Sequence, residues 1–135
     1  MTSQKIRILL VDDNETIRHT LASLLGSCAE FKLVGECISG AEAICRAGQL
    51  RPDVILLDIS LPDINGLEVA RRIKAITPAA EILLLSEHCL VAMVQEGLRA
   101  GARGYLLKSD AAQELSIAIR EVHKKQQYVG QRFGL

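Results

Sequence analysis

Acidic, hydroxyl and basic side chains follow four of the five short apolar runs in this chain. Asp12 and Asp13 follow the first run, Asp58 the third, Ser86 the fourth and Lys108 the fifth. If the runs are parallel strands, these side chains meet at one edge of the sheet, where open α/β folds bind their ligands. Carboxylates are hard oxygen ligands that suit Mg²⁺, and an aspartate can act as a nucleophile. The set therefore fits phosphoryl transfer to an aspartate.

Crowded carboxylates need a cation, because they otherwise repel one another and raise each other's pKa. A bound metal and Lys108 would neutralise the charge of a transferring phosphoryl group, while Ser86 would donate a hydrogen bond to one of its oxygens. Each residue alone has an ordinary explanation, since an aspartate after a strand is usually a turn former or a helix cap. Suitable groups at four strand ends favour a site over four unrelated loop residues.

The apolar runs predict the strands that position these groups. They span residues 6–11, 32–37, 54–57, 82–85 and 104–107, and their starts lie 22 to 28 residues apart. This spacing leaves room for one strand, one helix and two loops in each repeat. Four runs are almost continuously hydrophobic, as parallel strands buried on both faces are. The second run carries Lys32 and Glu36, which is typical of an edge strand.

The segments between the runs predict helices, because their apolar residues recur at helical spacing. Ser39 and Glu42 have the spacing of a capping box, and Asp110 can cap the last helix. Gly48 lies near a helix end, where a left-handed conformation suits glycine. The fourth helix, at about residues 90–100, has the weakest periodicity. The repeat predicts an α/β fold of the (βα)5 type, a doubly wound five-stranded parallel sheet with strand order 2-1-3-4-5.

Length and composition limit the function classes. The chain has 135 residues, which suits one domain, and it carries 16 basic and 16 acidic side chains. This balance gives no global attraction to nucleic acid or to an anionic membrane. An aromatic content of 3% without Trp disfavours a base-stacking surface. No apolar run approaches the ~20 residues of a membrane span, and no signal peptide is evident. The four cysteines form no C-x-x-C pair, so reduced thiols in a soluble, cytoplasmic protein are expected.

Four segments together resemble the receiver domain of two-component response regulators. They are residues 9–13 (LLVDD), 58–66 (DISLPDING), 84–86 (LLS) and 104–108 (GYLLK). The resemblance covers about residues 5–127, and residues 100–108 are especially similar to receivers of the NarL/LuxR class. It implies a flavodoxin-like receiver fold, with residues 1–127 as the receiver domain. Residues 128–135 would be a tail or the start of a linker to a missing effector domain.

The resemblance also implies a role for each residue of the site. Asp58 would accept the phosphoryl group from a phosphohistidine of a sensor histidine kinase or of a histidine phosphotransfer protein. Asp13, Asp58 and the backbone carbonyl of Ser60 would ligate Mg²⁺, with Asp12 acting through water. Lys108 would pair with the phosphate.

Ser86 and Tyr105 would form the switch of such a receiver. Ser86 would swing towards the phosphoryl oxygens and Tyr105 would follow by turning inward, which shifts a bistable element. The fourth helix, fifth strand and fifth helix would be the face that reports this change. Without the family, Tyr105 is better interpreted as a half-buried strand aromatic. Homodimerisation on phosphorylation is a further family expectation.

Some positions depart from the family pattern. Glu87 stands after Ser86, where receivers usually carry a small residue, so its carboxylate is expected to make phosphorylation slow or donor-selective. Ser60 and His88 occupy positions that face the attacking water in the family. We expect them to tune the lifetime of the phosphorylated state. Ser109 replaces the proline that often follows the lysine, so a cis peptide there would carry the larger non-proline penalty.

Four functions compete for this site. A phosphorylatable signalling switch fits every group, and it is an enzyme only in assisting its own phosphorylation and dephosphorylation. A phosphatase of the haloacid dehalogenase type uses a D-x-D motif, but Ser60 stands where the second carboxylate belongs. A nucleotide- or flavin-binding module would need a glycine-rich phosphate loop, and the sequence contains none. A receiver-like protein that acts only through contacts would not need the intact set of site residues.

The expected output is transcriptional, through a C-terminal helix-turn-helix that is absent from these 135 residues. The chain itself offers no recognition helix and no basic stripe. We therefore expect it to bind no membrane, and to reach DNA only through the missing domain. A stand-alone receiver that acts through protein–protein contacts is the alternative.

Overall fold

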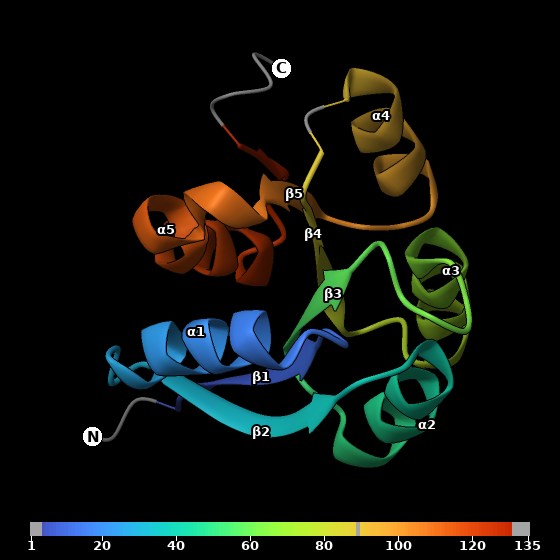
Figure 1. Cartoon of the computed structure of the whole chain (residues 1–135). Coiled ribbons are helices and arrows are strands. Elements are labelled where there is room, and N and C mark those ends of the chain that lie inside the picture. Colours follow the sequence, from blue (N-terminus) through green and yellow to red (C-terminus); the bar gives the residue numbers. More distant parts are fainter. Residues whose placement is uncertain (1–3, 89, 131–135) are drawn as a thin grey trace.

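The computed structural model describes residues 4–88 and 90–130, which form a parallel six-stranded sheet with helices on both faces (Figure 1). The strands are β1 (Ile6–Val11), β2 (Phe31–Cys37), β3 (Val54–Asp58), β4 (Glu81–Ser86), β5 (Gly104–Leu107) and β6 (Tyr128–Val129). The helices are α1 (Glu15–Gly26), α2 (Gly40–Leu50), α3 (Gly66–Ile76), α4 (Val91–Arg99) and α5 (Ala111–His123), with a 3-10 turn, η1, at Lys108–Asp110. The strand order β2-β1-β3-β4-β5 confirms the predicted topology.

Two hydrophobic cores lie on the two faces of the sheet. In β1, Leu9 and Val11 belong to the core under α2, α3 and α4, whereas Ile8 and Leu10 belong to the core under α1 and α5. All four side chains have no exposed surface. The continuous apolar runs therefore arise because β1, β3, β4 and β5 are covered by a helix layer on both faces of the sheet (Figure 1).

Strand β2 is the edge strand that its charges predict. Lys32 and Glu36 are exposed, while Phe31 and Cys37 at the strand ends are buried. Its pairing with β1 shifts register between Ile8 and Leu9.

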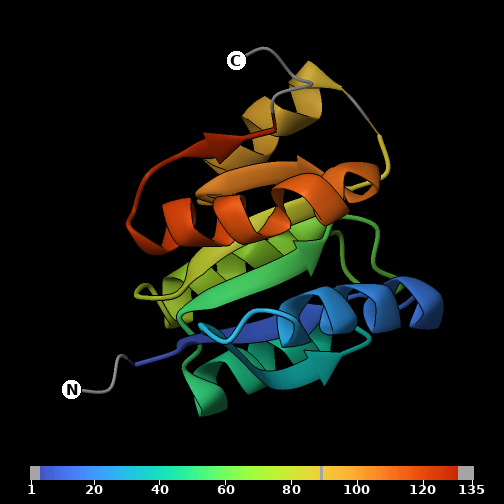
Figure 2. The same cartoon turned by 90° about the vertical axis from the view of Figure 1, so that its left-hand side faces the viewer.

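The chain after α5, where the sequence predicts a tail or the start of a linker, begins with a short strand. Tyr128 and Val129 form β6, which pairs in parallel with β5 and adds a sixth strand to the sheet (Figure 2). The Tyr128 amide donates to the Arg103 carbonyl at 3.1 Å, and the Gly130 amide donates to the Tyr105 carbonyl at 3.0 Å. A two-residue strand carries no periodicity, so the sequence pattern could not indicate it.

The helix ends follow the sequence only in part. Ser39 caps α2 by accepting a hydrogen bond from the Glu42 amide at 3.2 Å, as its spacing predicts. Within the described residues, Asp110 stands at the N-cap of α5 but its side chain makes no capping hydrogen bond. The left-handed residue that ends α2 is Arg51, with φ of 48°, and not Gly48.

Two further sequence expectations concern cysteines and membrane spans. Cys28, Cys37 and Cys45 are free thiols, and Cys89 lies outside the described residues. Across residues 4–88 and 90–130, no helix combines the length and the apolar character that crossing a membrane requires.

Candidate functional site

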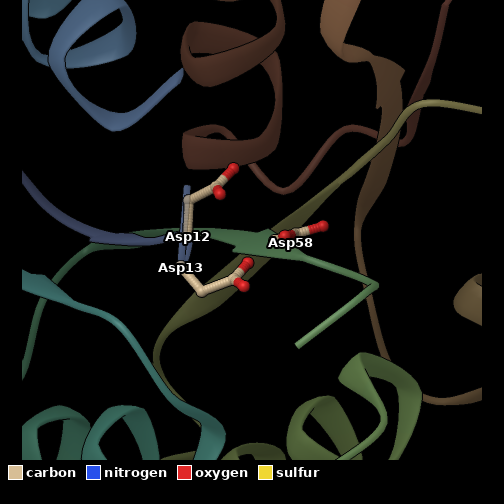
Figure 3. A group of neighbouring side chains, drawn as sticks. All are labelled: Asp12, Asp13 and Asp58. Carbon is tan, nitrogen blue, oxygen red and sulfur yellow. The ribbon is translucent and has the colours of Figure 1, made fainter. Parts of the chain in front are cut away.

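Three carboxylates converge where β1 and β3 end. The two strands are neighbours with Val11 level with Leu57, so Asp12 and Asp58 emerge side by side and Asp13 follows at the same edge. Each aspartate offers an oxygen, and the three oxygens lie within 4.8 Å of one another (Figure 3). Asp12 and Asp58 are buried and Asp13 is exposed. The cluster thus has two carboxylates inside the fold and one facing solvent.

Lys108 brings a positive charge to the buried pair from the end of β5. Its ammonium lies 2.9 Å from Asp12 Oδ2 and 3.2 Å from Asp58 Oδ1, and its side chain is 10% exposed. Three carboxylates and one ammonium leave a formal charge of −2 at the strand ends. That excess, carried on hard oxygen ligands, suits a divalent cation such as Mg²⁺.

Burial and the neighbouring charges set the protonation of this pair. Burial raises the pKa of Asp58, opposed by the Ser60 amide and by Lys108. Burial alone would lower the pKa of Lys108, but the carboxylates of Asp12 and Asp58 outweigh it and the pKa is raised. Lys108 therefore stays an ammonium across the physiological range, which leaves a fixed cation beside the candidate nucleophile.

Backbone hydrogen bonds fix the orientation of the two buried carboxylates. The Asn14 amide donates to Asp12 Oδ1 at 2.9 Å, and the Ser60 amide donates to Asp58 Oδ1 at 3.0 Å. Each aspartate therefore accepts one hydrogen bond from the loop that follows its own strand. Asp58 also lines an open pocket.

The pocket over Asp58 has a volume of about 480 Å³ and opens to solvent. Its lining residues are Asp13, Asn14, Glu15, Thr16, Asp58, Ser60, Glu87 and Lys108. Four of these carry carboxylates and one carries an ammonium, so the lining has a formal charge of −3. Glu87 lies at its rim and is exposed, as is His88 beside it.

Ser86 ends β4 and Tyr105 lies in β5, the two strands that follow β3 in the sheet. Ser86 is buried, and its Oγ accepts a hydrogen bond from the His88 amide at 3.0 Å. Among the described residues that line the pocket, Ser86 is not included. Tyr105 is fully buried in the core under α4, where its ring lies near Gly97. Its inward position goes beyond the half-buried aromatic that the sequence alone favours.

The loop between β3 and α3 is held at both of its ends. The Gly66 amide donates to the Ile59 carbonyl at 2.9 Å, and a Cβ on Gly66 would lie 2.5 Å from the Ile59 Cα. Only glycine permits this approach. Asp63, in the same loop, accepts hydrogen bonds from the first two amides of α2 at 2.8 and 3.0 Å.

Sequence reasoning missed this second cap of α2, as well as Asn14 and Arg18. Asn14 caps α1, and its place directly after the two aspartates is a signal that could have identified it. The Arg18 guanidinium donates to the Asp12 carbonyl at 2.9 Å and pairs with Glu36 at 3.1 Å. No sequence signal links Arg18 to this loop. The peptide before Ser109 is trans, since the described residues contain no cis peptide.

Comparison with known proteins gives one consistent result. Residues 8–120 match the family model of the response regulator receiver domain. The response regulator UvrY of Escherichia coli is 40% identical over 126 residues, which cover 92% of this chain and 57% of that protein. The DNA-binding transcriptional activator DevR/DosR of Mycobacterium tuberculosis is 38% identical over 117 residues, covering 87% of this chain and 54% of that protein.

Solved structures agree in fold. A LuxR-family response regulator from Aurantimonas has a TM-score of 0.92 at 29% identity, covering 97% of this chain and 94% of that one. The signal receiver domain of NarL from Mycobacterium tuberculosis has a TM-score of 0.88 at 31% identity, covering 92% and 100%. This chain spans about half the length of the curated relatives it matches. With residues 8–120 matched and the strand-end cluster in place, the chain belongs to the response regulator receiver domain family, among relatives of the NarL/LuxR class.

Proposed function

We propose that this receiver domain is a signalling switch that accepts a phosphoryl group on Asp58. The observation that carries the proposal is the geometry of Asp58, which is buried, lines the open pocket and lies 3.2 Å from the Lys108 ammonium. A carboxylate held in this way is oriented for attack, and the nearby Lys108 ammonium can neutralise the charge of the added phosphoryl group.

In the proposed reaction a carboxylate oxygen of Asp58 attacks the phosphorus of the donor. The phosphorus–nitrogen bond of a phosphohistidine breaks as the acyl phosphate bond forms, and the leaving imidazole takes up a proton. Lys108 balances charge on the transferred group, and the Ser60 amide keeps Asp58 oriented. Ser86 would complete the site only after its Oγ leaves the His88 amide. In this account the rotation of Ser86 distinguishes the two states of the switch, with Tyr105, whose ring is already buried, as its second member.

The residues at the strand ends fit Mg²⁺. Asp13, Asp58 and the backbone carbonyl of Ser60 would hold it, with Asp12 acting through water, because the three carboxylates lie close together and carry an excess negative charge. When bound, Mg²⁺ would withdraw charge from the phosphoryl oxygens.

The proposed partners follow from the family and from what its relatives do. A sensor histidine kinase or a histidine phosphotransfer protein would be the donor, in the cytoplasm. DevR/DosR is a DNA-binding transcriptional activator, which supports a transcriptional output through a further domain. A stand-alone receiver remains the alternative output. Homodimerisation on phosphorylation is part of the same proposal.

Intact mass after incubation with a small acyl phosphate tests the reaction. The expected result is one added phosphoryl group that requires Mg²⁺ and that disappears in Asp58→Asn. Asp13→Asn should require a higher Mg²⁺ concentration, whereas Asp53→Asn, at the opposite edge of the sheet, should behave as wild type. An adduct that forms equally well in Asp58→Asn, or no adduct from either an acyl phosphate or a phosphohistidine donor, would overturn the proposal.

A further inference from the structure

Strand β6 is attached to the part of the fold that carries Lys108. Two backbone hydrogen bonds hold it to Arg103 and Tyr105, at 3.1 and 3.0 Å. Its side chains pack on both sides of the sheet, since Val129 contacts one core and Tyr128 the other. β6 is thus a short strap that runs parallel to β5 along its outer edge (Figure 2).

One side-chain hydrogen bond fastens this strap to α5. The Tyr128 hydroxyl donates to Glu114 Oε1 at 2.6 Å. Burial and the Glu114 carboxylate raise the pKa of Tyr128 to about 12, so the hydroxyl keeps its proton at physiological pH. The rest of the attachment is two residues of strand pairing and the packing of Tyr128 and Val129 against the two cores, which is little for an independent element.

The strap lies tightly against β5. A Cβ on Gly104 would lie 2.9 Å from the Tyr128 carbonyl oxygen, so no side chain fits between the two strands. β5 has four residues, and Lys108 follows its last one. The Asp58–Lys108 ion pair is therefore connected to the Tyr105 carbonyl, which holds the Gly130 amide, through three residues of chain.

We propose that β6 is a releasable strap, which pairs with β5 while Lys108 bridges Asp12 and Asp58 and detaches when Asp58 is phosphorylated. This inference rests on the proposed function. The physical reason is the change of partner at Lys108, since the added phosphoryl charge draws its ammonium away from Asp12. A hydrogen bond of 3.0 Å is lost when its atoms move apart by roughly 0.5 Å, so a small shift of β5 is enough.

Release of β6 would expose the edge of β5 that it covers. The outer edge of β5 would gain unpaired backbone groups, and the chain after Val129 would leave the sheet. The strap therefore converts a charge change at Asp58 into a change in the backbone pairing of residues 128–130.

Hydrogen exchange of the Gly130 amide, followed by NMR on the 135-residue chain, tests the strap. Phosphorylation by an acyl phosphate and Mg²⁺ should speed this exchange by roughly tenfold or more, while amides in the middle of β1 keep their rates. Intact mass of the same sample reports the extent of phosphorylation. An adduct with unchanged or slower Gly130 exchange would overturn the strap alone. Absence of an adduct with both an acyl phosphate and a phosphohistidine donor would overturn the proposed function and the strap together.

A second variant tests the strap without phosphorylation. Tyr128→Phe removes only the hydroxyl that binds Glu114, so Gly130 should exchange about tenfold faster and respond less to phosphorylation. Ser27→Ala is the matched control, because it removes a hydroxyl that donates to the Leu24 carbonyl at the exposed end of α1. Equal Gly130 exchange in Tyr128→Phe and in wild type would contradict a role of the Tyr128–Glu114 hydrogen bond in holding the strap.

Discussion

Lys108→Met should destabilise the protein through the two carboxylates that it leaves behind. Asp12 and Asp58 are 0% and 2% exposed, and Lys108 is the cation within 3.2 Å of both. At an effective dielectric constant of about 20, each contact has a Coulomb energy of roughly 5 kcal/mol before the cost of burying the ammonium. Removal of one partner from a buried ion pair costs about 3 kcal/mol net. For a domain of this size the Tm should fall by roughly 10 °C.

Thermal unfolding followed by circular dichroism at pH 7.5 without Mg²⁺ measures this effect. Asp58→Asn added to Lys108→Met should restore part of the loss, because it removes one of the two uncompensated charges. Lys74→Met is the matched control. Lys74 also holds a buried carboxylate, Glu81, at 3.7 Å, but at the opposite edge of the sheet. The loss of stability in Lys74→Met should be the same with and without Asp58→Asn.

The stability loss caused by Lys108→Met should depend on pH. The pKa of Asp58 is raised, so its contribution to stability is present below about pH 3.9 and is lost as pH rises through the folded pKa. Lys108→Met should therefore recover stability as the pH is lowered towards that range. Equal unfolding temperatures of Lys108→Met and wild type, or no recovery with Asp58→Asn, would refute the reasoning.

Three further predictions concern other parts of the fold. Glu87→Gln should speed phosphorylation by a dianionic donor roughly fivefold at low salt, and the gain should shrink at high salt; equal rates at every ionic strength would rule out an electrostatic role. Hydrogen bonds from the first two amides of α2 lower the pKa of Asp63, so Asp63→Asn should lower the urea midpoint at pH 7, and the gap should close below about pH 4; a gap that persists there would contradict this. A chain that ends at Gln127 should lose about 2 kcal/mol of stability in urea unfolding, because Tyr128 and Val129 no longer pack and pair; an unchanged midpoint would restore residue 127 as the end of the folded unit.

The sheet could be predicted because its strands are long, buried and nearly evenly spaced. Val54 to Leu57 are fully buried, and only hydrophobic residues satisfy such positions in a run. The convergence of Asp12, Asp13 and Asp58 followed from topology, since adjacent parallel strands must end at one edge. These inferences needed only residue types and spacing.

The remaining features depend on contacts between segments far apart in the sequence. β6 is stabilised by the edge of β5 and by Glu114, and two residues alone carry no pattern. Arg51 takes the left-handed position that Gly48 was expected to supply, because α2 continues to Leu50 before it ends. Ser86 bonds to the His88 amide, a choice of rotamer that the sequence does not encode.

Identification of the phosphorylated residue tests the central claim most directly. The protein is phosphorylated with an acyl phosphate and Mg²⁺, reduced at once with borohydride, digested and sequenced by tandem mass spectrometry. An acyl phosphate on an aspartate is reduced to homoserine, so we predict homoserine at position 58 and unmodified aspartate at positions 12, 13 and 63. Homoserine at another aspartate, or a phosphoryl group retained on a hydroxyl side chain, would contradict the assignment of Asp58 as the phosphoacceptor.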